Sequence, residues 1–422
     1  MDLQPEINLK KLFYVGVEAV SPEKRIPRHL PKKPKGRTIV IGAGKASAWM
    51  AKVLEELWDE PLSGVVVVPY EHKTNTRNIK IIEAGHPIPD QQSENAAHEM
   101  MEVVSNLNAD DLVISLMSGG GSSLLAYPIE GIALQDIKLI NRALLSSGAS
   151  IKEINTVRQA MSGIKGGQLR LAALPAQIVT LVMSDVAGDD PSIIASGPTI
   201  LPTDSEPVSD ILKRYDLNIP DKLKKILTNR RLNILNREGF QADTVNIIAR
   251  AGDALEAAAT QAKKWGWDVI NLGDSISGIA TEIAKINAEE ALKMATFRST
   301  TSPPLILLSG GEATVSLNSA TGYGGPNSEY LLALALTLNH DPKIWALACD
   351  TDGIDGNSQN AGGFLTPYSI AGATELGLDP TGLLAAHRSA EFFDILGHNV
   401  VTGPTLTNVN DFRSIAICAG AY

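Results

Sequence analysis

Cysteine is nearly absent from this sequence, and so are the features that mark secreted, membrane-spanning or nucleic-acid-binding proteins. Only Cys349 and Cys418 occur, far apart, which argues against a disulfide framework and a thiolate zinc site. No apolar run approaches the roughly 18 residues that a spanning helix needs, and the N-terminus resembles neither a signal peptide nor a transit peptide. These absences predict a cytoplasmic enzyme.

The chain also lacks a long basic run, and its formal net charge is −10. Nucleic acid and acidic membranes are therefore poor candidates for partners. A site for a small anion has to be local, built from a few Lys, Arg and backbone amide groups. We expect small-molecule substrates and a monomer or homodimer.

The 422 residues exceed what one hydrophobic core usually supports, so the length favours two domains. Buried strand patterns alternate with helical patterns, which is typical of the α/β class. From Leu201 to Asp243 the composition changes to prolines, basic residues and short helices. We therefore predict an N-terminal α/β domain over residues 1–240 and a C-terminal α/β domain over residues 241–422, with a strand at Thr244–Ala249 opening the second.

A triple-glycine turn is the most prominent local motif. Leu112–Met117 has the pattern of a buried strand, and a turn of small residues follows it directly. Glycines let backbone N–H groups approach an anion closely, and serines add hydroxyl donors. The turn either binds a phosphate or carboxylate, or merely joins a strand to a helix. Its residues are Ser118, Gly119, Gly120, Gly121, Ser122 and Ser123.

A second glycine turn, GAGKAS, follows the predicted strand that starts near Arg37. It contains Gly44 and Lys45 but matches neither the dinucleotide-binding pattern nor the P-loop pattern. Lys45 at a helix start is well placed to contact a phosphoryl oxygen, although a solvated surface lysine is the alternative. His86, in the segment GHPIPD, is a secondary candidate because it follows another predicted strand.

A predicted helix from Glu153 to about Leu171 carries polar side chains at steps of three, four and three residues. Asn155, Arg158, Ser162 and Lys165 fall within an arc of roughly 80° at 100° per residue. This ladder of donors either contacts an anion or forms a solvated edge of the helix.

Three carboxylates lie close together after the predicted strand Ala176–Met183, namely Asp185, Asp189 and Asp190. They would repel one another unless a cation lies among them, and Mg²⁺ is the obvious candidate. Helix-capping aspartates are the alternative. The small residues Ser196 and Gly197 follow shortly afterwards and are further binding candidates.

The C-terminal half offers weaker candidates at the ends of its predicted strands. Gly310, Gly311 and Glu312 repeat the earlier glycine motif. Asn327 and Glu329 precede the apolar helix Tyr330–Leu338, whose N-terminus should present free amides to an anion. Asp350 and Asp352 do not fit an EF-hand loop and either line a polar cleft or cap turns. These residues complete the list of candidates.

Eight segments in chain order, from about Arg37 to Ala416, resemble the class II glycerate 2-kinases, whose C-terminal part is called the MOFRL domain. The segments are VIGAGKAS, GHPIPD, LMSGGGSSLL, NTVRQAMSGIKGG, MSDVAGDDPSIIASGPT, LSGGEATV, DTDGIDG and TGPTLTNVND. The resemblance implies two Rossmann-like α/β domains with an interdomain active-site cleft. It also implies ATP-dependent phosphorylation of D-glycerate to 2-phosphoglycerate with Mg²⁺, and Lys45 matches the family's catalytic lysine.

Phosphoryl transfer requires mostly positioning and charge neutralisation, which suggests roles for these residues. The triple-glycine turn would cradle anionic oxygens, Lys45 would support the transferring phosphoryl group, and Asp189 and Asp190 would hold Mg²⁺. Asp185 would accept or orient the 2-hydroxyl proton. Arg158 and Lys165 would receive either the glycerate carboxylate or the ATP phosphates, and the sequence does not divide these duties.

One departure from the family pattern is Pro326, which stands where many relatives have a catalytic arginine in the motif GGRNQE. The positive charge of that arginine must come from other groups here, or the acceptor has changed to a related hydroxy acid. Because members of the family are often labelled hydroxypyruvate reductase, the main alternative is an NAD(P)-dependent hydroxypyruvate or tartronate reductase. However, GAGKAS lacks the third glycine of a dinucleotide fingerprint. A non-catalytic ligand sensor is a third possibility.

Overall fold

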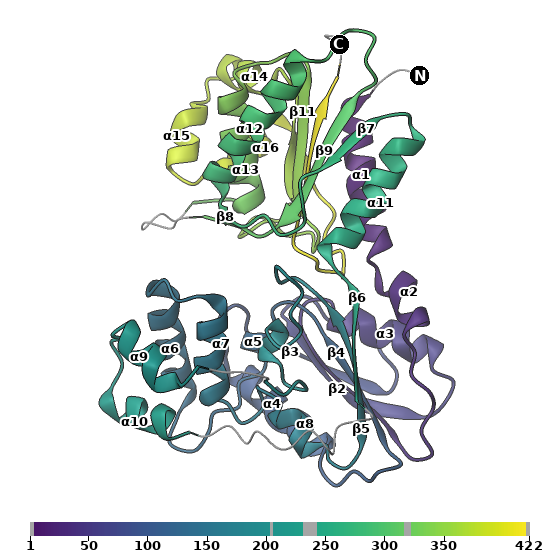
Figure 1. Ribbon diagram of the computed structural model, residues 1–422, viewed down its shortest axis with the longest axis vertical. Helices are drawn as coiled ribbons and strands as arrows, with labels where there is room; N and C mark the ends of the chain where they lie inside the picture. Colours follow the sequence, from purple (N-terminus) through teal and green to yellow (C-terminus); the bar gives the residue numbers. More distant parts are fainter. Residues whose placement is uncertain (1–3, 203–205, 231–242, 316–321, 419–422) are drawn as a thin grey trace. The chain divides into compact units, whose positions relative to one another are not determined.

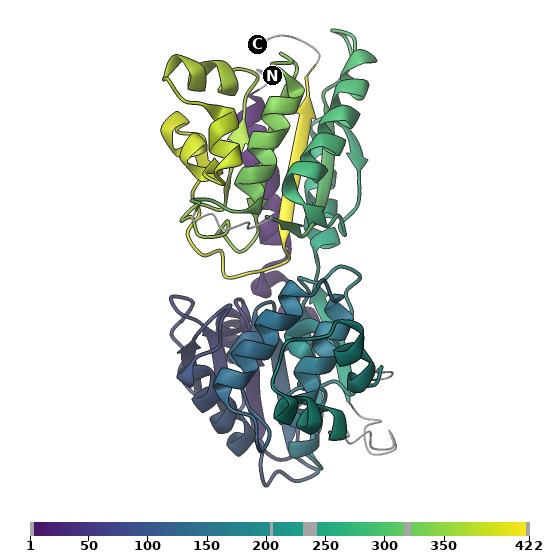
Figure 2. The same ribbon diagram turned by 90° about the vertical axis from the view of Figure 1, so that its left-hand side faces the viewer.

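The computed structural model describes residues 4–202, 206–230, 243–315 and 322–418, and the chain forms two compact units (Figures 1 and 2). One, which we call the glycine-loop unit, consists of Arg25–Ser184 and Asp189–Ile248. The other, the C-terminal unit, consists of Met1–Lys24, Asp185–Gly188 and Ala249–Tyr422. Both combine helices with a six-stranded sheet, which confirms the α/β class.

The sheet of the glycine-loop unit has the strand order β3-β2-β1-β4-β5-β6. Neighbouring strands from β3 to β5 are parallel. β1 and β4 are buried along their whole length, as unbroken apolar runs predict for strands covered on both faces. The strands are β1 (Thr38–Ala43), β2 (Leu62–Pro69), β3 (Ile79–Ala84), β4 (Leu112–Met117), β5 (Gln177–Met183) and β6 (Thr244–Ala249).

The last strand of this sheet differs from the sequence interpretation, which assigns Thr244–Ala249 to the C-terminal domain. It lies instead at the sheet edge beside β5. Thr244 and Val245 are exposed, as an edge position allows. A local apolar pattern identifies a strand but does not specify which sheet it joins.

Helices and short helical segments lie between the strands of the glycine-loop unit. Asp90 begins α4 with a capping box, because its side chain accepts a hydrogen bond from the Ser93 amide, as its position in the sequence predicts. The helical elements are η1 (Ile26–Arg28), α3 (Ser47–Leu57), α4 (Gln91–Val103), α5 (Gly121–Leu124), α6 (Leu134–Ser146), α7 (Ile151–Ala160), α8 (Gln168–Ala172), η2 (Ile194–Ser196), α9 (Val208–Arg214) and α10 (Asp221–Asn229), and α2 (Pro22–Arg25) spans the boundary between the units.

The single helix predicted over residues 153–171 is wrong, because α7 ends at Ala160 and α8 begins only at Gln168. Gly166 and Gly167 have φ angles of 58° and 79°, which a continuous right-handed helix does not allow. The intervening segment turns toward residues 125–129, where Ser162 bridges to Pro128 and the Gly163 amide donates to the Tyr127 carbonyl.

The C-terminal unit has a mixed sheet in the order β13-β12-β11-β14-β9-β7. β14 is antiparallel to both β11 and β9, whereas β7 and β9 are parallel. A separate pair joins β8 (Gly278–Ile279) and β10 (Ala313–Thr314). The main strands are β7 (Asp268–Asn271), β9 (Leu305–Gly311), β11 (Ile344–Asp350), β12 (Gly362–Leu365), β13 (Asn399–Val400) and β14 (Asp411–Ile417).

Helix α13 (Pro326–Leu338) is apolar around most of its circumference and is almost wholly buried. It packs against α12 (Ala280–Thr296) in the core of the C-terminal unit. The other helices of this unit are α1 (Pro5–Ala19), α11 (Ala251–Lys264), α14 (Ser369–Glu375), α15 (Pro380–Ala385) and α16 (Ser389–Leu396).

Helix α1 belongs to the C-terminal unit although it comes first in the sequence. It packs beside α11 (Figure 1), and its residues Leu9, Leu12 and Phe13 are fully buried. The ring of Phe13 meets that of Phe412 on β14 edge to face, with 5.8 Å between centroids. The predicted first domain over residues 1–240 therefore differs from the compact units at its N-terminal end.

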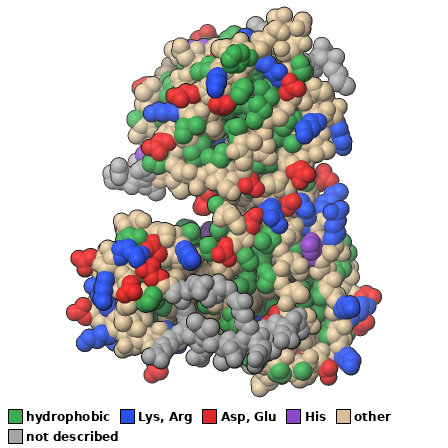
Figure 3. Space-filling model, viewed as in Figure 1, with side chains coloured by type: hydrophobic (Ala, Val, Ile, Leu, Met, Phe, Trp, Pro, Cys, Tyr) green, Lys and Arg blue, Asp and Glu red, His purple; other side chains and the backbone are tan. Residues whose placement is uncertain are grey.

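No helix in the described ranges has both the length and the apolarity needed to cross a membrane. On the face shown in Figure 3, Lys and Arg side chains lie interspersed with Asp and Glu side chains. That distribution agrees with the lack of a long basic run in the sequence.

Candidate active site

The triple-glycine turn and the GAGKAS turn lie side by side, because they follow the neighbouring parallel strands β4 and β1. The chain builds the sheet outward in opposite directions from these two strands, and ligands of open α/β sheets bind beyond the carboxyl ends of strands at such a point. The Lys45 amide donates to the Gly119 carbonyl at 2.9 Å, and the Ala46 amide donates to Ser118 Oγ at 3.1 Å. The two turns are therefore held together by direct hydrogen bonds.

Two glycines in these turns are required by close packing. A Cβ atom on Gly44 would lie 2.2 Å from Ser118 Oγ, and Gly44 also has a φ angle of 136°. A Cβ atom on Gly121 would lie 2.6 Å from the Cβ of Ala195 and 2.9 Å from the Ala43 carbonyl oxygen. Close approach of neighbouring chain segments thus explains both residues, whether or not an anion binds there.

His86 lies against the triple-glycine turn, where the sequence placed it only as a secondary candidate. Its Nδ1 atom is 2.8 Å from Ser123 Oγ, and Ser123 Oγ in turn donates to the Gly120 carbonyl. A Cβ atom on Gly120 would lie 3.1 Å from His86 Cε1. The imidazole is exposed, so it is available to a ligand that binds at the turn.

A chain of hydrogen bonds connects the triple-glycine turn to α7 through η2. Ser196 Oγ donates to Asn155 Oδ1 at 2.7 Å and lies 2.8 Å from Ser122 Oγ. Because the single hydroxyl proton of Ser196 is used toward Asn155, Ser122 is the donor in the second bond. Three of the predicted binding residues are thereby brought together, with Gly197 directly after Ser196 in the left-handed region at φ 60°.

Lys165 lies just beyond the triple-glycine turn, and Arg158 is near enough to Lys165 to affect its pKa, but the two are not on one continuous helix. Lys165 is 5% exposed, and its ammonium group donates to the Leu125 carbonyl just beyond α5. Arg158 Nε donates to Asn141 Oδ1 of α6 at 3.0 Å. Burial, and secondarily the charge of Arg158, lowers the pKa of Lys165 from 10.5 to about 7. Burial also lowers the pKa of Arg158.

Ser162 does not belong to a ladder of ligand donors. Its buried hydroxyl oxygen accepts hydrogen bonds from the amides of Ile164 and Lys165, both at 3.3 Å. It therefore shapes the turn after α7, and the four-residue arc predicted for a single helix does not form.

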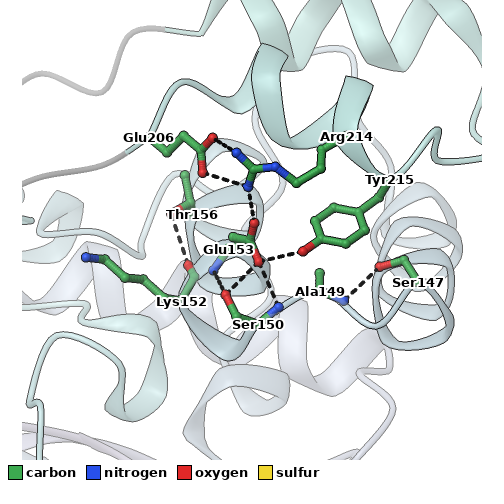
Figure 4. Close-up of polar contacts among 9 residues, drawn as sticks. All are labelled: Ser147, Ala149, Ser150, Lys152, Glu153, Thr156, Glu206, Arg214 and Tyr215. Carbon is green, nitrogen blue, oxygen red and sulfur yellow. Dashed lines mark hydrogen bonds and ion pairs between the residues drawn. The ribbon is translucent and has the colours of Figure 1, made fainter.

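The N-terminus of α7 is anchored by a cluster around Glu153 (Figure 4). Glu153 Oε2 accepts from the hydroxyl groups of Ser150 and Tyr215, and Arg214 pairs with Glu153 and Glu206. The hydrogen bond from Ser150 is the main cause that lowers the pKa of Glu153 to about 2. This cluster fixes the helix that carries Asn155 and Arg158.

The three carboxylates after β5 are divided between the two compact units, with Asp185 in the C-terminal unit and Asp189 and Asp190 in the glycine-loop unit. Asn408 Nδ2 donates to Asp185 Oδ2 at 3.3 Å, and Asn410 Nδ2 donates to the Asp185 carbonyl. Asp190 Oδ1 accepts from the Ser192 amide at 2.9 Å and from its hydroxyl group at 2.7 Å, as a turn-capping aspartate does.

Within the described residues, no group of three or more His, Cys, Asp or Glu side chains could hold a metal ion. The metal site predicted at Asp189 and Asp190 stays a prediction. Both are oxygen donors, which Mg²⁺ prefers, and Asp190 is exposed.

The N-terminus of α13 does not present free amides, contrary to the sequence prediction. The amides of Asn327 and Ser328 each donate to the Asp355 carboxylate at 2.8 Å. Pro326 has no N–H group and occupies the first helical position, where proline is well tolerated. Burial raises the pKa of Asp355 to about 6. A protein carboxylate thus already occupies the position expected for an anion.

The remaining candidates of the C-terminal unit have partners within the protein. A Cβ atom on Gly311 would lie 2.3 Å from the Ile276 carbonyl oxygen, and the Gly310 amide donates to the Gly273 carbonyl. Glu329 is buried and pairs with His387 at 2.8 Å. Glu312 follows Gly311 directly at the end of β9.

Asp350 and Asp352 act as turn caps, which was one of their two interpretations. Asp350 Oδ1 accepts from the Asp352 amide at 2.9 Å, and Asp352 Oδ1 accepts from the Ile354 amide at 2.8 Å. Lining of a polar cleft by these two aspartates stays a prediction.

Several polar residues around these candidates were not predicted from the sequence. Gln159 donates to the Ser196 carbonyl at 3.3 Å and lies one helical turn after Asn155, so the helical spacing could have identified it. Asn141 and His387 gave no such signal, because each meets a partner that is distant in the sequence.

Two family models match the chain. The family described as "domain of unknown function (DUF4147)" matches residues 8–228, and the MOFRL family matches residues 305–411. A relative from Agrobacterium vitis labelled as a hydroxypyruvate reductase is 45% identical, over 97% of this chain and 94% of the relative.

Kinases are among the relatives as well. The glycerate 2-kinase of Pyrococcus horikoshii is 37% identical, over 93% of this chain and 90% of the relative. The D-glycerate 2-kinase of Thermotoga maritima is 35% identical, over 94% of each chain. The crystal structure of a Thermotoga maritima glycerate kinase superposes with a TM-score of 0.85 at 33% identity, covering 98% of this chain and 99% of that one.

Proposed function

We propose that this chain, which belongs to the glycerate 2-kinase family, phosphorylates the 2-hydroxyl group of D-glycerate with ATP and yields 2-phosphoglycerate and ADP. The family resemblance seen in the sequence motifs is confirmed by kinase relatives at 35–37% identity over more than nine-tenths of the chain. Within the structure, the observation that carries the proposal is the contact between the turn of Lys45 and the triple-glycine turn, beyond the carboxyl ends of β1 and β4.

The proposed chemistry uses these groups to neutralise charge. The 2-oxygen of glycerate attacks the γ-phosphorus of ATP, the bond to the ADP oxygen breaks, and the hydroxyl proton leaves to a base. Lys45 and the amides of the triple-glycine turn support the phosphoryl oxygens, where the developing charge is spread. Asp185 is our proposed base or orienting group, and the side chain of Asn408 holds one of its carboxylate oxygens.

A divalent cation and ATP fit this reaction but are themselves part of the proposal. Asp189 and Asp190 would hold the cation, which would neutralise phosphate charge when bound. Because Pro326 supplies no charge at the start of α13, the transferred group depends more on Lys45 here than in relatives with an arginine at that position. An active site shared by the two units, a cytoplasmic location, and a monomer or homodimer stay predictions.

Phosphorus NMR after incubation with ATP, Mg²⁺ and D-glycerate tests the reaction directly. We expect a phosphate ester at the 2-position and stoichiometric ADP. Tartronate and four-carbon aldonates, supplied in parallel, would reveal a different acceptor. A decrease in NADH absorbance with hydroxypyruvate, without ADP release from glycerate, would instead support the reductase label carried by the Agrobacterium relative.

A further inference from the structure

Two cations of the glycine-loop unit have no counter-ion among the residues that the structure describes. The Leu125 carbonyl is the sole hydrogen-bond acceptor of the Lys165 ammonium group within the part of the chain that the structure describes. Arg158 contacts a neutral amide oxygen of Asn141 through Nε, and its two terminal nitrogens have no hydrogen-bond partner among the described residues. Neither cation forms an ion pair with a described carboxylate.

Three other arginines of this protein are paired with carboxylates. Arg170 pairs with Asp243, Arg214 pairs with two glutamates, and Arg413 pairs with Asp411. Charged groups removed from water are costly unless they are paired. Two neighbouring, unpaired cations of like sign are therefore an unusual arrangement that an incoming anion would relieve.

The contacts of these cations bear on the duties that the sequence left open. Lys165 contacts the residue just after α5, whereas Lys45 contacts the beginning of the triple-glycine turn through its own amide. Asn141 holds Arg158 Nε and leaves the planar pair of terminal nitrogens for two parallel hydrogen bonds, the geometry that suits a carboxylate or a phosphate group.

We propose that Arg158 and Lys165 form the subsite for the carboxylate of the acceptor, with Arg158 binding both carboxylate oxygens and Lys165 neutralising the charge. This inference rests on the proposed function, since it names the part of the acceptor that this site binds. Acceptors without a carboxylate, such as glycerol, should then be rejected because the two cations stay unpaired.

The test compares Arg158→Gln and Lys165→Met with the matched exposed controls Arg142→Gln and Lys152→Met. We expect KM for D-glycerate to rise roughly 10- to 100-fold in the first two variants, as the loss of a charged hydrogen bond implies. KM for ATP should stay within about twofold, and the controls should match the wild type. Arg158→Lys keeps the charge but not the planar pair of terminal nitrogens, so it should recover only part of the affinity for D-glycerate.

Titration calorimetry with D-glycerate and with glycerol, without nucleotide, separates this proposal from the kinase assignment. If the wild type binds D-glycerate and both variants lose this binding, the subsite is supported even when no phosphorylated product forms. Absence of that product would contradict only the kinase proposal. Unchanged glycerate affinity in folded variants, a selective rise in KM for ATP, or no wild-type binding of D-glycerate would overturn the subsite. Circular dichroism confirms folding, and Arg158→Lys serves should Arg158→Gln not fold.

Discussion

Lys165 has a buried ammonium group with one carbonyl acceptor among the described residues, and this makes its protonation unfavourable in the folded state. Its pKa is lowered from 10.5 to about 7, so between these values the unfolded chain binds a proton that the folded chain does not. The free energy of unfolding therefore increases as the pH rises from 7 toward 10.5. The destabilisation caused by the buried charge of Lys165 is fully present below pH 7.

We predict that wild-type stability gains about 2 kcal/mol between pH 7 and pH 9 relative to Lys165→Met, which lacks the titrating group. Urea unfolding of both proteins at the two pH values measures this difference, with Lys152→Met as the exposed control. Parallel changes in the wild type and Lys165→Met would contradict the buried-charge interpretation. At pH 7 we expect Lys165→Met to be at least as stable as the wild type, because it removes an unpaired buried charge.

For Lys45 we predict a catalytic effect without a structural one. The contact that holds its turn to Gly119 is made by the backbone, so Lys45→Ala keeps it. We expect kcat to fall by a factor on the order of 100 or more, as for removal of one group that stabilises transition-state charge. Steady-state kinetics check this, with Lys52→Ala of α3 as the control. Near-normal turnover with unchanged KM would exclude the role.

At the residue scale, sequence analysis identified single candidates better than the contacts among them. Asn155, Ser196 and Ser122 were all predicted, but the hydrogen bonds that connect them depend on the chain turning back after Ala160. That turn follows from the left-handed backbone at Gly166 and Gly167. A helical projection extended through these glycines therefore placed Ser162 and Lys165 wrongly.

At the element scale, the start of α5 tests how tightly the two glycine turns fit. Gly121→Ala places a Cβ atom 2.6 Å from the Cβ of Ala195. We predict a loss of about 1–3 kcal/mol in unfolding free energy, as for overpacking of a close-packed site. Thermal unfolding measures the loss, and Gly372→Ala in α14, where the added atom has ordinary contacts, serves as the control. An unchanged melting temperature would show that the turn relaxes freely.

The start of α13 depends on the hydrogen bonds that Asp355 accepts. Asp355→Ala leaves the buried amides of Asn327 and Ser328 without acceptors, so we predict a loss of about 2–4 kcal/mol. Asp379→Ala removes an exposed cap from α15 and should cost about 1 kcal/mol or less. Denaturant unfolding of the two variants compares them, and equal losses would argue against the buried cap.

Elements with a strong local pattern were predicted well, and elements set by distant contacts were not. The strand at Leu112–Met117 has the predicted bounds because its apolar run stops at the serine and glycines that follow. The expectation of free amides on α13 failed because their acceptor, Asp355, arrives from a loop 27 or 28 residues away.

At the scale of the whole molecule, the N-terminal helix should stabilise the end of the chain rather than the sheet that follows it. Phe13 is fully buried against β14, so we predict that Phe13→Ala costs about 3–5 kcal/mol in the C-terminal unit. Hydrogen exchange should increase in α11 and β14 and stay unchanged in β1 and β4. Tyr14→Ala, at a side chain that is 48% exposed, is the neighbouring control.

The division into units was only partly accessible from the sequence. The change of composition over residues 201–243 suggested a boundary, but β6 lies beyond it and still joins the first sheet. The contact of α1 with α11 joins segments more than 200 residues apart, and an amphipathic pattern specifies an apolar face without its partner.

The backbone passes from one compact unit to the other four times, after residues 24, 184, 188 and 248. Neither compact unit is therefore encoded by one continuous segment of the gene. A chimera that takes the C-terminal unit from a relative must exchange three separate segments at once, including a tetrapeptide. A single crossover would leave α1 packed against helices and strands from the other parent. Homologous recombination within this lineage is therefore expected to keep together the two compact units that come from one parent.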